Sequence, residues 1–216
     1  MTSDPPASAS AVDTLATALG KRILDGEFRP GEFLRDVKMA EEYATSRHTF
    51  RVAARTLVVQ GLLRQIPNRG FFVPDFGPDD IVDITRLRGV LEGEAIRMIV
   101  LTGIIPPAAI AAVDFMRQAR NLDDRSALVT ADRDFHRAIV EASGSERLKR
   151  SYDSLESEIG LLLIQRQTFY SDASQMTDEH DRLVDSLRSR HYETARAAFL
   201  EHWNDLQIKL LDQRKA

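Results

Sequence analysis

Apolar residues in the first 75 positions form short helical repeats separated by turn residues. The spacing predicts helices over residues 12–24 and 37–44, and a third that begins at Thr45 or Ser46. Two apolar bursts then flank PNRG, which predicts a short β-hairpin. We expect a helix-turn-helix followed by a hairpin wing in this half of the chain.

After residue 77 the strand signals stop and only longer helical repeats remain. They predict an all-helical bundle, with helices over about 79–103, 107–121, 125–142, 145–168, 174–189 and 192–213. The fold class is therefore mostly α, with two domains. We expect a disordered tail over 1–10, a DNA-binding domain over 11–75, a linker over 76–80, and a helical domain over 81–216.

The composition and the apolar stretches limit the chemistry and the cellular location that we expect for the protein. The chain has 216 residues, a net charge of −4 and no cysteine, which excludes disulfides, thiolate metal sites and a cysteine nucleophile. The N-terminus has no basic start with an apolar run, and no apolar stretch is long enough to span a bilayer. We expect a cytoplasmic protein without a membrane partner.

One stretch of the first domain is basic. Residues 43–74 contain five arginines and no acid. Arg47, Arg51 and Arg55 recur every four residues, so they share one face of the third helix and repel one another unless a polyanion lies alongside. The alternative is a basic face that is merely solvated. Ser46, His48 and Thr49, in the helix's first turn, are placed to meet phosphates or base edges.

The stretch from GEFRPGEFL to RGFFV resembles the DNA-binding domain of the GntR family of bacterial transcription regulators. The shared motifs are G-x-x-x-P-G-x-x-L, S-R-x-x-x-R, G-L-L and R-G-x-x-V. The family favours Thr-Pro where this chain has His48-Thr49, and an acid where it has Val52, so the operator sequence stays open. With Arg69 expected to reach the minor groove, the candidate DNA contacts are Arg35, Ser46, Arg47, His48, Thr49, Arg51, Arg55, Arg69 and Gly70.

Three histidines of the second half fall on apolar helix faces. They are His136, His180 and His202, and Asp132 lies one turn before His136 on the same stripe. Each of the three histidines, taken alone, is more simply interpreted as a core residue. Together they would bury several polar groups, at about 1–3 kcal/mol each if unpaired. One divalent ion would satisfy them all, and the donor set accepts Zn²⁺, Ni²⁺, Mn²⁺ or Fe²⁺, of which we favour Zn²⁺.

Residues 77–216 also resemble the FCD effector domain of the FadR subfamily of these regulators. The metal-binding branch carries D-x-x-x-H on one helix, a histidine opening a later helix and another 22 residues on, which Asp132, His136, His180 and His202 match. The resemblance implies one metal ion per chain with coordination sites left open for a small carboxylate effector. RLRGVLE matches the family's R-x-x-L-E, which suggests Arg88 as the effector's cationic partner. The alternative is a surface pair between Arg88 and Glu92.

These patterns favour a transcription regulator, most often a repressor in this family, that binds operator DNA as a homodimer and responds to a small organic acid. Two alternatives remain open. A metal-dependent enzyme acting on an organic acid, with a DNA-binding appendage, has the same ligands but lacks a general base at helical spacing, such as the glutamate of H-E-x-x-H. A helical scaffold with core histidines needs no metal at all.

Overall fold

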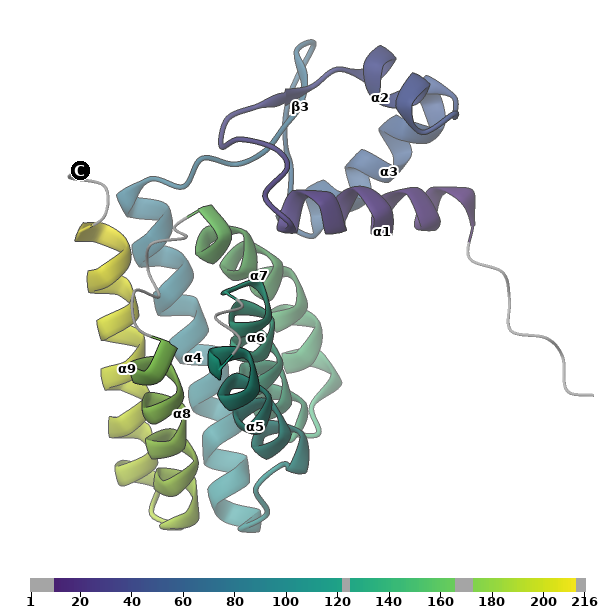
Figure 1. Ribbon diagram of the computed structural model, residues 1–216. Coiled ribbons are helices and arrows are strands. Elements are labelled where there is room, and N and C mark those ends of the chain that lie inside the picture. The colour runs from purple at the N-terminus through teal and green to yellow at the C-terminus, as the bar shows by residue number, and fades with distance from the viewer. Residues whose placement is uncertain (1–9, 122–124, 166–172, 213–216) are drawn as a thin grey trace, which may run out of the picture. The chain divides into compact units, whose positions relative to one another are not determined.

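The computed structural model describes residues 10–121, 125–165 and 173–212 (Figure 1). The chain divides into two compact units between Asp75 and Phe76. Ser10, expected to belong to the tail, instead caps the first helix, and the rest of the tail lies outside the described residues.

The first unit is a winged helix-turn-helix, which confirms the predicted fold. The Ser10 side chain accepts a hydrogen bond from the Asp13 backbone, and the Asp13 carboxylate accepts one in return, so the first helix starts with a capping box. The elements are α1 (Ala11–Leu24), β1 (Phe33–Leu34), α2 (Asp36–Glu42), α3 (Arg47–Val59), β2 (Arg64–Ile66) and β3 (Gly70–Phe72).

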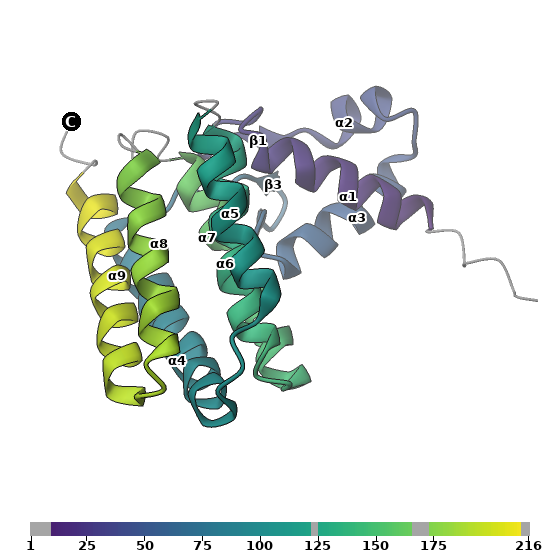
Figure 2. The same ribbon diagram turned by 60° about the horizontal axis from the view of Figure 1, so that its bottom comes forward.

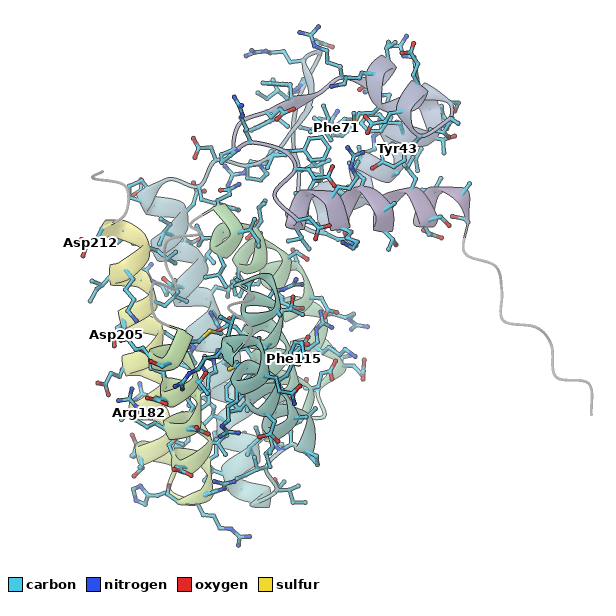
Figure 3. The ribbon with its side chains drawn as sticks, in the orientation of Figure 1. Tyr43, Phe71, Phe115, Arg182, Asp205 and Asp212 are labelled. Carbon is cyan, nitrogen blue, oxygen red and sulfur yellow. The ribbon has the colours of Figure 1, made fainter. Side chains whose placement is uncertain are left out.

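The wing contains one strand more than the predicted hairpin. The sheet order is β1-β3-β2, and β3 pairs antiparallel with both neighbours. Phe71 of β3 is fully buried and meets the Phe50 ring edge-on at 6.1 Å, so the sheet is fixed to α3 (Figure 3). At the hairpin turn, Asn68 and Gly70 adopt positive φ angles of 63° and 105°.

The second unit is helical throughout its described residues, as predicted. Its helices are α4 (Pro78–Thr102), α5 (Pro107–Asn121), α6 (Arg125–Glu141), α7 (Glu146–Gln165), α8 (Ala173–Arg188) and α9 (Tyr192–Asp212). The expected linker over 76–80 is too long, because α4 already begins at Pro78. The Gly77 backbone N–H donates to the Asp80 carboxylate at 2.8 Å, and proline suits the first helical position.

The helices pack as a bundle around an apolar interior. α4 lies against α9 and α6, and α8 lies against α9 and α5 (Figure 2). Phe135 of α6 and Phe199 of α9 are fully buried and stack at 6.3 Å. Among the residues described, no helix by itself has the length and apolar content to cross a membrane, although α4 and α5, bent by 114° at their junction, meet that test as a pair.

Candidate metal centre and DNA interface

Three helices of the bundle bring four ligand-type side chains together. Asp132 and His136 lie on α6, His180 on α8 and His202 on α9, and one donor atom from each lies within 4.8 Å of the others. The first three are buried and His202 is 9% exposed. The residues predicted from the sequence thus meet at one point. His180 lies in the middle of α8, whereas the resemblance implied that it would open its helix.

Two of the histidines are oriented by hydrogen bonds at Nδ1. His136 Nδ1 lies 2.8 Å from Glu92 Oε2, and His180 Nδ1 lies 2.8 Å from the Met176 carbonyl oxygen. Both partners are acceptors, so in each ring the proton belongs on Nδ1 and the Nε2 lone pair is free. This is how metal-binding histidines are held in proteins, with the outer nitrogen donating to a carboxylate or carbonyl.

His202 completes the set from α9. Its Nδ1 lies 3.6 Å from Glu179 Oε2, and the same side chain of Glu179 faces Lys209 at 3.3 Å. Burial would raise the pKa of the Glu179 carboxyl, but its contacts with His202 and Lys209 lower that pKa to about 2. A fixed negative charge therefore faces the outer side of His202.

The inner atoms of the cluster lack hydrogen bonds. Among the described residues, no hydrogen-bond partner exists for Nε2 of His136, His180 or His202, nor for Asp132 Oδ2. His180 Nε2 lies 3.2 Å from Asp132 Oδ1, and His136 Nε2 lies 3.8 Å from the same oxygen. Buried and unpaired, each such atom costs about 1–3 kcal/mol. Three imidazoles and a carboxylate that converge in this way fit a divalent ion.

The protonation states also suit a metal ligand set. Burial, reinforced by the charge of Arg88, holds the pKa of His136 well below its usual value, and burial likewise lowers the pKa of His202. Burial would raise the pKa of Asp132, but His180, His136 and Arg88 outweigh it and hold that pKa far below its usual range. At neutral pH His136 and His202 are therefore neutral imidazoles and Asp132 is an ionised carboxylate, as metal ligands must be.

Arg88 lies beside the cluster and is buried. Its Nε donates to Glu92 Oε1 at 2.8 Å, and its Nη2 lies 3.8 Å from Asp132 Oδ2. The pair with Glu92 that the sequence suggested is present, but it lies in the core and not on the surface. Nη1 has no hydrogen-bond partner among the described residues. The guanidinium thus keeps one free edge next to the predicted ligands.

Glu92 organises the outer side of the site. Its Oε1 also accepts from Tyr152 OH at 2.8 Å, and its Oε2 from Trp203 Nε1 at 3.1 Å, in addition to the bonds with His136 and Arg88. Sequence reasoning missed Tyr152 and Trp203. Glu92 itself had one usable signal, its position one turn after Arg88 on a helix face that the bundle buries.

The Phe135 ring lies behind the ligands. Its ring centroid lies 5.0 Å from that of His136 and 4.9 Å from that of His180, both edge-on. Ile139, one turn further along α6, is fully buried. A close-packed wall restricts the imidazole rotamers and excludes water from this side of the cluster.

Several exposed basic side chains of the first unit lie on α3 and the wing. Arg47, His48 and Arg55 are exposed, as a DNA-contacting face requires. Ser46 caps α3, because its hydroxyl oxygen accepts from the Thr49 backbone N–H at 3.0 Å. The start of α3 therefore carries polar side chains and exposed cations together.

Arg51, unlike Arg47 and Arg55, has partners among the described residues of the first unit. Its Nη1 lies 2.6 Å from Asp36 Oδ2, and its guanidinium stands over the Phe71 ring at 5.6 Å. The sequence argument treated Arg47, Arg51 and Arg55 as three uncompensated charges on one face. The acid that pairs with Arg51 precedes it by 15 residues and lies on α2, so helix spacing on α3 does not show it.

The wing presents its predicted cation next to the turn. Arg69 is exposed, with its guanidinium 5.1 Å from the Phe33 ring centroid. Gly70 follows with a positive φ that favours glycine, so its role in the structure is the turn itself. Arg35 is exposed at the start of α2 and gives that helix no side-chain cap.

Two family matches cover most of the chain. The bacterial regulatory proteins of the gntR family match residues 11–73, and the FCD domain matches residues 83–205. The second match alone spans more than half of the 216 residues. The resemblances to the GntR DNA-binding domain and to the FCD domain are thereby confirmed.

Individual relatives agree with these matches. The chain is 24% identical to the uncharacterized HTH-type transcriptional regulator YdhC of Bacillus subtilis (strain 168), over 86% of this chain and 84% of that protein. It is 26% identical to the galactonate operon transcriptional repressor of Escherichia coli (strain K12), over 87% and 91%. The fold is that of a solved GntR regulator from Rhodococcus sp. RHA1 (TM-score 0.83, 24% identity, 94% and 99% covered). Because these proteins are transcriptional regulators and not enzymes, the metalloenzyme alternative is set aside.

Proposed function

The chain belongs to the GntR family of bacterial transcriptional regulators and carries an FCD domain, and we propose that a small carboxylate bound at a metal ion in that domain controls its affinity for operator DNA. The four buried donor atoms that converge without hydrogen bonds support this proposal most directly. A scaffold with ordinary core histidines would pair those atoms with each other or with nearby acceptors. Here the ring nitrogens that have such partners are the outer Nδ1 atoms of His136 and His180.

The donor set indicates which metals would bind. Three imidazole nitrogens and one carboxylate oxygen, without sulfur, suit Zn²⁺, Ni²⁺, Mn²⁺ or Fe²⁺, and we favour one Zn²⁺ per chain. Asp132, His136, His180 and His202 would hold the ion. When bound, it would supply positive charge and open coordination positions for an anionic ligand. The residues around it would fix the ligand side chains and exclude water.

The charges of the buried groups point to a carboxylate. Arg88 contributes one positive charge, while Glu92 and Asp132 contribute two negative charges, so the buried set without metal carries one net negative charge. A divalent ion changes the sum to one net positive charge, which a single carboxylate would neutralise. We assign Arg88, through its unpaired Nη1, to an oxygen of that effector.

On DNA, we propose a homodimer that reads two half-sites, because one recognition helix contacts only a few base pairs. Ser46, Arg47, His48, Thr49 and Arg55 would act from α3, with Arg35, Arg51, Arg69 and Gly70 as further contacts. Effector binding would favour one of two arrangements of the DNA-binding units, and operator affinity would change accordingly.

A DNA-release experiment tests the proposal. A duplex selected from a random-sequence pool by Zn²⁺-loaded protein serves as the probe, and binding is followed by fluorescence anisotropy. Small carboxylic acids are then added to the loaded protein and to protein stripped by a chelator. We expect at least one acid to change DNA affinity in the loaded protein only. An equal response of both forms would refute a metal-bound effector.

A further inference from the structure

The burial pattern of α3 shows which of its side chains face away from the core of the first unit. Four buried residues define the inward face, and they are Phe50, Ala53, Ala54 and Leu57. Residues that follow one another at alternating steps of four and three share one face of a helix. On the opposite side of α3 they form a set that we call the outward stripe, namely His48, Val52, Arg55 and Val59. Val52 is half-buried, and the other three are exposed.

Arg51 lies at the edge of this stripe and is held inside the unit. Its Nη1 is 2.6 Å from Asp36 Oδ2, and its guanidinium stands 5.6 Å from the Phe71 ring centroid. These contacts direct Arg51 toward α2 and the sheet. The side chain that lies between His48 and Arg55 on the outward stripe is the apolar Val52. The stripe therefore combines two basic side chains with a branched apolar one between them.

Val52 lies in the part of α3 that would meet the bases of DNA. Recognition helices of helix-turn-helix proteins contact base edges through their N-terminal residues, and Val52 belongs to the second turn of α3. His48 precedes it by about one turn and Arg55 follows it by about one turn, and both are candidate DNA contacts. With these two side chains in the major groove, Val52 faces a base edge between them.

A valine at a base edge discriminates between the bases, because its side chain neither donates nor accepts a hydrogen bond. In the major groove, guanine, adenine and cytosine present hydrogen-bonding atoms, whereas thymine presents a carbonyl oxygen and the C5 methyl group. A polar edge covered by the valine would lose its water without gaining a partner. The thymine methyl group would instead bury apolar surface against the valine.

We propose that Val52 contacts the C5 methyl group of a thymine in the operator and thereby determines the base preferred at that position. The contact assigns base discrimination to an uncharged residue that is not among the predicted DNA contacts. It rests on the proposed operator binding through α3, and it involves neither the metal ion nor the effector.

Val59 provides a matched control on the same stripe. It is 78% exposed, so solvent reaches this valine as well, but it is the last residue of α3. It lies roughly 10 Å further along the helix axis than Val52, away from the N-terminal turns that contact bases. Val59→Ala should therefore leave the dependence of binding on thymine methyl groups unchanged.

Replacement of thymine by uracil tests the contact, since uracil lacks only the methyl group. In the duplex that the wild-type chain selects from a random-sequence pool, each thymine is replaced in turn, and binding of the full chain is measured by fluorescence anisotropy. For the wild type, we expect one or more positions at which affinity falls roughly 4-fold for each methyl group removed. Val52→Ala keeps a good helix former but withdraws the side chain, so it should bind the thymine and uracil duplexes equally at those positions.

Two outcomes would overturn the contact. The first is a wild-type affinity that depends on no thymine methyl group, and the second is a Val52→Ala variant that keeps the full loss on replacement by uracil. The result for each variant is a ratio between two duplexes, so a general change in folding or affinity cancels. No acid is added in this experiment, so a failure of effector control, which is measured separately with acids, would leave its result unchanged.

Discussion

The two units of this chain place their charges in opposite surroundings. In the first unit Arg47, Arg55 and Arg69 project into solvent from α3 and the wing. In the second, Arg88, Glu92 and Asp132 are buried within one bundle. Exposed cations interact with a long anion over a distance set by salt, whereas buried charges are compensated only by groups in contact.

This difference separates the consequences of mutation. Removing an exposed arginine should change DNA binding and leave the fold intact. Removing a buried metal ligand, or a residue that orients one, should change metal binding and the stability of the second unit. It should leave the direct contacts between α3 and DNA unchanged.

Loss of a ligand should have the largest effect. His180→Ala removes one of the four donors and leaves the other three without a complete site. We expect metal affinity to fall by more than the roughly 100-fold that outer-shell changes cost. Elemental analysis after Zn²⁺ loading and desalting measures it. The control His191→Ala changes an exposed histidine between α8 and α9 and should retain the metal; equal zinc in both variants would contradict the ligand assignment.

Loss of a residue that orients a metal ligand should lower metal affinity by a smaller factor. Glu92→Gln keeps the shape of the side chain but removes the charge that faces Arg88, and it replaces one of the two oxygens that face Arg88 and His136 with an NH2 group that cannot accept. We expect metal affinity to fall by about 10–100-fold, measured by competition with a chelator of known affinity. Glu201→Gln, an exposed change on α9, is the matched control. Unchanged metal affinity in Glu92→Gln would mean that Glu92 does not contribute to metal binding.

In the first unit, Arg47 and Arg51 offer a comparison within one helix. Arg47→Ala should weaken operator binding by about 1–3 kcal/mol if it contacts a base, without changing the melting temperature. Arg51→Ala should lower the melting temperature as well, because Arg51 also binds Asp36 and covers Phe71. Fluorescence anisotropy and thermal unfolding of both variants measure the two effects. If the two variants had the same DNA affinity and the same melting temperature, the Asp36 contact would contribute nothing to stability.

The smallest effect should be the pH dependence of the metal-free protein. His136 and His202 have lowered pKa values when folded, so below their usual value of 6.5 the unfolded chain binds protons that the folded chain does not. Stability is therefore present above pH 6.5 and is lost as the pH falls below it. We expect the melting temperature to fall by several degrees between pH 7.5 and 5.5. A melting temperature that rises over this range would contradict the sign.

The sequence predicted the helices of the second unit closely, because each buries a broad apolar stripe that repeats over several turns. It also predicted that Asp132, His136, His180 and His202 face inward, since each shares a stripe with apolar neighbours. Their convergence at one point needed the three-dimensional packing of α6, α8 and α9. The argument that one divalent ion would satisfy all four buried groups anticipated it, and the resemblance to the FCD domain implied the same four ligands.

Other features left no local pattern in the sequence. β1 has two residues, too few for an alternation, and its pairing with β3 joins residues almost 40 positions apart. The Asp36–Arg51 pair and the bonds of Tyr152 and Trp203 to Glu92 likewise join different helices. Contacts between separate elements are set by packing, so helix periodicity does not report them.

The bond between Trp203 and Glu92 has a practical consequence. The chain contains a single tryptophan, so all indole fluorescence comes from this one ring. Its N–H donates to the Glu92 carboxylate, which also faces the predicted metal ligand His136, and emission from an indole depends on the charge and polarity beside it. The unlabelled protein is thus a spectroscopic sensor of its own buried site, and a titration with metal or organic acid can be followed in a cuvette without a dye.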